Sequence, residues 1–198
     1  MDNNLLNLLL IIFIIIIGVK IYIDSDTFNL RCIISDVNGN KYCVRDRSKL
    51  HLAADKLANV NIKLNKLVAH LGKKFPNKEN VKRLVNGYNP KKIYETLPTS
   101  EYTAYSENKG EKLAFCLDTE KNNNGRLIDL NTLTYVALHE LSHIATKSIG
   151  HNDEFWQNFK FLISEAKEIN IYNPVDYKNE PARYCGMNIS DNPYYDVK

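Results

Sequence analysis

The chain has 198 residues, of which 44% are hydrophobic and 25% are charged, an ordinary composition for one globular domain with an appendage. The formal net charge is only +3, and the basic residues are dispersed among acids. Without a clustered basic stripe, a nucleic-acid partner is unlikely on electrostatic grounds, and the charge balance points to no other partner.

The N-terminal segment 5–23 is apolar apart from Asn7 and Lys20. Nineteen helical residues at about 1.5 Å each span roughly 28 Å, close to the hydrocarbon thickness of a bilayer. A cleaved signal peptide fits less well, because Met1–Asn4 carries no basic residue and no small-x-small cleavage site follows. A buried core helix is the weaker alternative. We therefore predict a membrane-spanning N-terminal helix.

This anchor divides the chain into residues 1–23, a polar spacer at 24–29 and a main domain at 30–198. No basic side chain precedes the apolar segment, whereas Lys20 and Arg31 follow its centre. Positive charge is enriched on the cytoplasmic side of membrane proteins, so the sequence favours a cytoplasmic main domain.

Periodic and alternating patterns predict the order of elements in the main domain. The first half contains strands at 30–35 and 41–45 around Asn38-Gly39, a helix from Ser48 to Gly72 and Pro76, a short helix at 79–86 and a turn of helix at 91–97. The second half contains strands at 102–106 and 112–117, an exposed loop at 118–126, a helix around residue 140, another at 153–170 and an irregular tail from 173.

The helix around residue 140 carries His139-Glu140-Leu141-Ser142-His143. Histidines at i and i+4 project from one helical face, so both imidazoles can bind one metal ion while Glu140 serves as general base. Asn131 stands where the N-cap of this helix is expected. The pattern predicts a metal site with His139 and His143 as ligands.

A catalytic zinc site takes three protein ligands, so a third must come from elsewhere. His151 is the first candidate, since Gly150 can end the helix in a left-handed conformation and turn the chain back. Glu165 or Glu168 on the following helix is the alternative, in the manner of sites with two histidines and a glutamate. Alanine at His151 would separate the two.

The four cysteines, Cys32, Cys43, Cys116 and Cys185, form no C-x-x-C pair, which argues against a zinc ribbon or a redox motif. Cys32 and Cys43 flank the first predicted hairpin. Disulfides and buried free thiols remain open alternatives.

His139–His143, Gly150-His151 and Glu154-Phe155-Trp156 together resemble the WLM/SprT-like branch of zincin metallopeptidases, and the pattern over 30–198 is similar to metallopeptidase-like proteins of large DNA viruses. Seven residues separate His143 from His151, a longer spacing than in shorter members of the family. The resemblance implies an α+β zincin-like minidomain with an active-site helix, a small antiparallel sheet and an edge strand that pairs with substrate. Leu113–Leu117 is the candidate for that edge.

The resemblance also implies a zinc-dependent endopeptidase that acts on a protein or peptide substrate. Together with the apolar segment 5–23, it predicts an enzyme anchored in a host or virion membrane. Bound Zn²⁺ would supply the Lewis acid and Glu140 the general base. Zincins often use an assisting tyrosine, for which Tyr172, Tyr177 and Tyr184 are candidates. Met187 is considered as a floor beneath the metal, although a core or loop role fits it better.

Two other functions compete with this one. A non-catalytic, zinc-stabilised module could mediate membrane or virion interactions, but a structural zinc site needs no general base such as Glu140. A protease of DNA–protein crosslinks is suggested by some members of the family, and the apolar anchor and the weak net charge argue against it.

Overall fold

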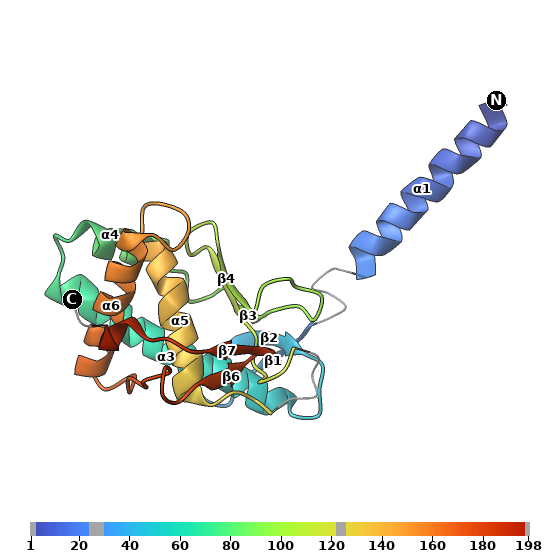
Figure 1. The fold of residues 1–198 in the computed structure, drawn as a ribbon. Coiled ribbons are helices and arrows are strands. Elements are labelled where there is room, and N and C mark those ends of the chain that lie inside the picture. The colour runs from blue at the N-terminus through green and yellow to red at the C-terminus, as the bar shows by residue number, and fades with distance from the viewer. Residues whose placement is uncertain (1–2, 24–29, 122–125, 197–198) are drawn as a thin grey trace.

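The computed structural model describes residues 3–23, 30–121 and 126–196. The predicted spacer at 24–29 and residues 122–125 of the predicted loop lie outside the described residues. Helix α1 (Asn3–Ile23) projects away from the rest of the chain (Figure 1). Its apolar stretch Asn4–Tyr22 is long enough to cross a membrane and is 0% buried inside the structure, which argues against a role as a core helix.

The remaining elements form an α+β body in which helices cover a sheet (Figure 1). The helices are α3 (Leu50–Lys74), α4 (Glu79–Gly87), α5 (Leu130–Ala145), α6 (Asp153–Glu168) and the short 3-10 helix η1 (Pro193–Tyr195). The strands are β1 (Leu30–Ile34), β2 (Lys41–Arg45), β3 (Ile93–Glu95), β4 (Ala104–Glu107), β5 (Lys112–Phe115), β6 (Ala182–Tyr184) and β7 (Met187–Ile189).

The main sheet has the order β1-β2-β3-β5-β4 and is mixed, because β3 runs parallel to both β2 and β5. The prediction that the sheet is antiparallel is therefore wrong. The cause is β3, which occupies part of the segment 91–97 that the sequence assigned to a turn of helix. Its pairing with Leu113, Ala114 and Phe115 supplies tertiary hydrogen bonds that local periodicity does not reveal.

The predicted edge strand is also wrong. Leu113–Leu117 overlaps β5, which lies between β3 and β4 and is almost fully buried. The edge strand next to β5 is β4, which pairs only with β5 in the described sheet, and the opposite edge is β1. The main sheet therefore presents β4, and not β5, to a neighbouring strand.

Helix α5 is the centre of the body and packs on α3, α4 and α6 as well as on β4 and β5. Its N-cap is Asp129, whose carboxylate accepts a hydrogen bond from the N–H of Thr132 at 2.9 Å. The predicted cap, Asn131, lies one residue inside the helix, where its side chain instead bonds the backbone of Asn173 in both directions. The helix therefore starts two residues earlier than the sequence suggested.

A buried ion network holds the segment that leads into β4. Arg45 is 1% exposed and donates to the carbonyl oxygen of Thr96 at 2.8 Å, while its own N–H donates to Glu95. Arg47 joins Glu95 to Asp118, with its Nη1 2.7 Å from an Asp118 oxygen. Asp118 is thus buried, although the sequence placed it in an exposed loop. Buried charges of this kind are tolerated because they are paired.

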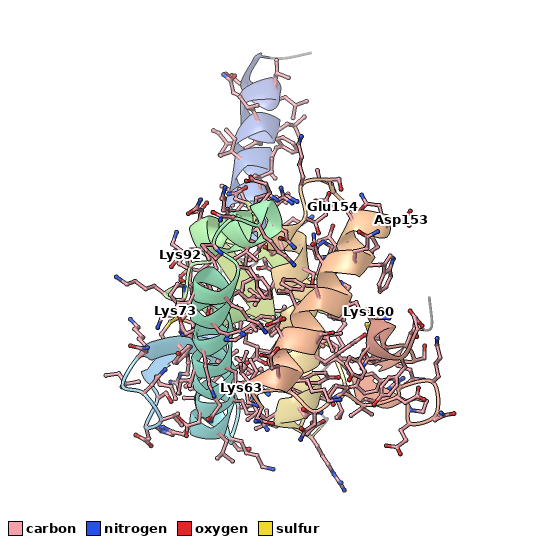
Figure 2. The ribbon with its side chains drawn as sticks, turned by 90° about the vertical axis from the view of Figure 1, so that its left-hand side faces the viewer. Lys63, Lys73, Lys92, Asp153, Glu154 and Lys160 are labelled. Carbon is pink, nitrogen blue, oxygen red and sulfur yellow. A yellow bond between two sulfur atoms is a disulfide. The ribbon has the colours of Figure 1, made fainter. Side chains whose placement is uncertain are left out.

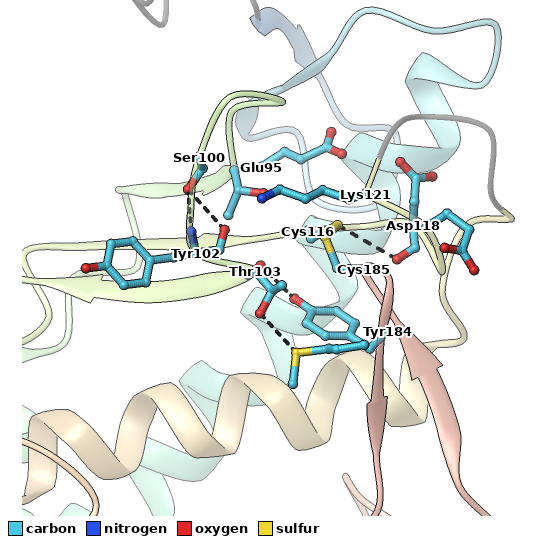
Figure 3. The surroundings of a disulfide bond; sticks show 12 residues. Glu95, Ser100, Tyr102, Thr103, Cys116, Asp118, Lys121, Tyr184 and Cys185 are labelled. Atoms are coloured by element: carbon cyan, nitrogen blue, oxygen red, sulfur yellow. Dashed lines mark hydrogen bonds between the residues drawn. A yellow bond between two sulfur atoms is a disulfide. The ribbon is translucent and has the colours of Figure 1, made fainter.

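All four cysteines are joined in disulfides, Cys32–Cys43 across β1 and β2 and Cys116–Cys185 between the end of β5 and the β6–β7 turn. The second bond ties the C-terminal hairpin to the main sheet (Figure 3). This hairpin corrects the prediction of an irregular tail. Disulfides persist mainly in oxidising compartments, so they weigh against the cytoplasmic placement that the charge pattern favours, which stays an untested prediction.

Lysines on α3 bind the neighbouring end of α6. Lys63 donates to the carbonyl oxygen of Ile171, and Lys66 donates to that of Ile169 at 3.2 Å. In Figure 2, Lys63 and Lys73 project from α3 and Lys160 from α6. Cations near the C-terminus of a helix offset its exposed carbonyl groups, so part of the basic charge of the chain serves the fold.

Candidate metal centre

The helical half of the centre is α5, which carries His139 and His143 one turn apart with ring centroids separated by 5.0 Å. Nearly every other residue of this turn is buried, including Leu138, Leu141 and Ile144. The core therefore fixes the rotation of the helix about its axis, and both imidazoles face the same side.

His151 comes from the loop between α5 and α6. Its Nε2 lies 3.0 Å from Nε2 of His139, and the ligand atoms of His139, His143 and His151 all lie within 4.8 Å of one another. Gly150 has φ +87°, the left-handed conformation expected for it. The helix itself ends earlier than predicted, at Ala145, so Gly150 bends the loop and does not end the helix.

Aromatic side chains of α6 support the three imidazoles. The ring of Phe155 lies 4.8, 4.5 and 4.6 Å from the rings of His139, His143 and His151, respectively. Trp156 Nε1 donates to the backbone oxygen of His151 at 3.1 Å. The aromatic face of α6, which packs in the core, therefore also contacts the histidine cluster.

The titration of these groups suits metal binding. Burial, reinforced by the neighbouring histidines, lowers the pKa of His139 to about 3, and burial and His151 lower the pKa of His143 to about 4. Both imidazoles are therefore neutral at pH 7, with a lone pair available for a metal ion. Burial raises the pKa of the Glu140 carboxyl to about 8. A carboxyl group with a pKa this close to neutral can both accept and release a proton near pH 7.

Three converging imidazoles are a donor set that catalytic zinc takes, so the residues present fit such an ion. Glu165 and Glu168, the alternative third ligands, belong to a separate group with His70. Glu165 is there bonded to His70 Nε2 and to Lys74 Nζ, each at 3.0 Å. The geometry thus brings His151, and neither glutamate, to the histidine pair.

The histidines open onto a groove of about 900 Å³. One wall is β4 with the turn that follows it, and the opposite wall is the loop that carries His151. The lining residues are Leu97, Ser100, Tyr102, Ala104–Lys109, His139, Glu140, His143 and Ile149–His151. The free edge of β4 therefore runs beside the candidate metal centre.

The candidate assisting tyrosines are all buried. Tyr172 and Tyr177 pack with Tyr135 in an aromatic cluster of the core. Tyr184 lies close enough to Glu140 for the carboxylate to help raise the tyrosine pKa, after the larger effect of burial. Its hydroxyl donates to the carbonyl oxygen of Thr103 at 3.1 Å (Figure 3), so Tyr184 supports the start of β4.

Met187 lies on β7, 48% exposed, with its sulfur 3.6 Å from the hydroxyl of Thr103. The side chain that underlies all three histidine rings is Phe155. Phe155 belongs to the Glu154-Phe155-Trp156 segment that carries the family resemblance, but its contact with all three histidine rings could not be predicted from the sequence.

The WLM domain family matches residues 84–195, more than half of the chain and all of the candidate centre. The chain belongs to the WLM family. This family is SprT-like, zincin-related, metallopeptidase-like and in general metal-dependent. Helix α3 and the β1–β2 hairpin precede the matched segment, yet their buried side chains are part of the same hydrophobic core as the WLM domain.

Relatives of this WLM protein occur in viruses. It is 31% identical to the uncharacterized protein R325 of Acanthamoeba polyphaga mimivirus over 161 residues, which cover 79% of this chain and 81% of the relative. It is 29% identical to protein 136R of Invertebrate iridescent virus 6 over 75 residues, 38% of this chain and 41% of the relative. No solved structure matches the chain.

Proposed function

We propose that this WLM protein is a zinc-dependent endopeptidase anchored to a membrane by α1. The observation that carries the proposal is the convergence of His139, His143 and His151 beside the buried carboxyl of Glu140, at the base of a groove. A purely structural metal site needs neither the groove nor the carboxyl group. Both are what peptide hydrolysis requires.

In this proposal the three histidines would hold Zn²⁺. When bound, the ion would act as a Lewis acid that lowers the pKa of its water to roughly 7 and polarises the scissile carbonyl group of the substrate. Glu140 accepts the proton of the attacking water and passes it to the leaving amine. Because Glu140 is buried, few other water molecules can reach its carboxyl group. The hydroxyl of Tyr184 donates to the carbonyl oxygen of Thr103 and so holds the backbone at the start of β4.

The edge of β4 supports an extended peptide as substrate. A peptide can add to a free sheet edge through main-chain hydrogen bonds, which give affinity with little dependence on sequence. Tyr102 and Ile149 stand at the groove, 66% and 92% exposed. Such exposed apolar side chains favour a bulky apolar residue near the scissile bond of the substrate.

The test uses the full chain in lipid nanodiscs, with an unfolded protein as substrate and Glu140→Gln as the matched variant. We expect one equivalent of zinc in both proteins and cleavage by the wild type only, with a rate at least about 100-fold lower in the variant because general-base catalysis contributes that much.

Zinc in both proteins without cleavage in either would instead favour the non-catalytic interaction module at a membrane or virion. Absence of zinc from both would contradict the proposed centre. Sequencing the N-terminus of the membrane-bound protein from expressing cells tests the anchor, since a cleaved signal sequence would be missing from it.

A further inference from the structure

The tip of the β4–β5 hairpin is packed against α4 and the end of α5 with no space for a side chain at two glycines. A Cβ atom on Gly87 would lie 2.5 Å from the carbonyl oxygen of Lys109, and one on Gly110 would lie 2.5 Å from that of Gly87. Both would also lie 2.8 Å from the side chain of Ile144 on α5. The hairpin tip is therefore fixed closely against the metal-binding helix.

Lys109 extends from this tip to the end of α5. Its Nζ donates to three backbone carbonyl oxygens, those of His143 at 3.1 Å, Thr146 at 2.9 Å and Ser148 at 2.8 Å. Carbonyl groups in the last turn of a helix lack intrahelical partners and carry partial negative charge, so an ammonium group satisfies them well. One side chain thus joins β4 to a metal ligand and to the loop that carries another.

Other contacts hold the same loop from the helical side. Arg83 donates to the carbonyl oxygen of Ala145 at 2.8 Å, and Glu154 accepts from the N–H of Lys147 at 3.2 Å. Asn158 donates to the Thr146 hydroxyl at 2.9 Å. These bonds come from α4 and α6, so they secure the loop to the helices, whereas the three bonds of Lys109 secure it to the β4–β5 hairpin.

We infer that Lys109 is a positioning residue that fixes the separation between the substrate-pairing edge of β4 and the metal ligands His143 and His151. The inference rests on the proposed function. A peptide bound along β4 reaches the reacting centre only at one separation, and an error of about 1 Å in such placement can lower a rate by about 100-fold.

The experiment compares Lys109→Met, which removes the donors, with Lys109→Arg, which keeps a cation that can donate to carbonyl oxygens. Lys92→Met is the matched control, because Lys92 lies on the same end of the sheet and its Nζ pairs with the exposed Glu111 at 3.0 Å. An exposed pair of this kind contributes little.

We expect Lys109→Met to lower kcat/KM on an extended peptide by about 10- to 100-fold. Lys109→Arg should recover part of that loss, and Lys92→Met should match the wild type. A merely structural role would lower the melting temperature without this selective loss and recovery. Wild-type rates in a folded Lys109→Met protein would overturn the inference.

A second readout does not depend on catalysis. Loosening of the His143 and His151 backbone should speed the release of zinc to a chelator by about 10-fold in Lys109→Met, as expected when a group that supports metal ligands is lost. If the wild type binds zinc but cleaves nothing, the proposed function fails while this release rate still tests Lys109. Equal release rates would then overturn the inference.

Discussion

Two clusters in this WLM protein offer metal-ligating side chains at similar spacing, and their surroundings differ. His139, His143 and His151 meet with only imidazole nitrogens facing one another. His70, Glu165 and Glu168 also meet, but the ammonium group of Lys74 lies 3.0 Å from Glu165 and 2.5 Å from Glu168. The second cluster already contains its cation, and the first requires one from outside.

The comparison shows that ligand spacing alone does not define a metal site. Lys74 offsets one of the two negative charges of Glu165 and Glu168 and already contacts their oxygen atoms, so the cluster attracts a divalent ion less strongly. The imidazole nitrogens of His139 and His151, held 3.0 Å apart, have no such internal cation and lose little by binding a metal. We therefore expect zinc at the histidine cluster and none at the His70 cluster.

The strongest test of this contrast is removal of His151. We expect His151→Ala to weaken zinc binding by at least about 100-fold, beyond the loss typical of groups that only support ligands. Zinc content after competition with a chelator measures it, and Glu165→Gln is the matched control that should retain a full equivalent. Full zinc in His151→Ala with loss in Glu165→Gln would reverse the assignment of the third ligand.

The second test is the pH dependence of the metal-free protein. Unfolding raises the pKa of His139 and His143 from about 3 and about 4 toward the usual 6.5, so the unfolded chain binds more protons below pH 6.5. The two histidines should therefore reduce stability as the pH is lowered from 7 to 4, while Glu140, whose pKa is raised to about 8 in the folded chain, opposes this change. We expect the two histidines to contribute a loss of at least about 1.4 kcal/mol, the equivalent of one pKa unit, seen as the difference between the wild type and a variant that lacks them.

Urea unfolding at each pH measures this loss, and a His139→Asn, His143→Asn double variant is the control in which it should shrink. A loss that persists undiminished in the double variant would show that other groups cause it.

The smallest expected effect concerns the second cluster. Glu165 is 8% exposed and bonds His70 and Lys74, so Glu165→Gln should destabilise the metal-free chain by about 1 kcal/mol through weakened hydrogen bonds. Urea unfolding at pH 7 checks the value. A destabilisation that appears only when zinc is present would indicate that Glu165 acts on the metal after all.

Local sequence patterns predicted the parts of the site that lie on one element. His139, Glu140 and His143 follow from helical spacing, and the left-handed Gly150 follows from its residue type. The position of β5 inside the sheet could not be predicted, because alternation of apolar residues does not encode strand order.

Other features depend on tertiary contacts that no spacing reports. Asp129 and Asn131 are both good N-cap residues, and only the bond between Asn131 and Asn173 decides between them. Lys109 was not predicted as part of the site, since its three carbonyl partners lie at least 34 residues away along the chain. The Asn108-Lys109-Gly110 turn was its only local signal.

The Cys116–Cys185 disulfide closes a loop with a sequence separation of 69 that contains His139, Glu140, His143 and His151. In a chain-entropy estimate, a loop of this size stabilises the folded state by about 4 kcal/mol. The disulfide also determines the effect of a single backbone cleavage. A cut inside this loop, by any protease, leaves two fragments that are still covalently joined, each held against the common core. Such a cut does not by itself separate His139, His143 and His151 from one another.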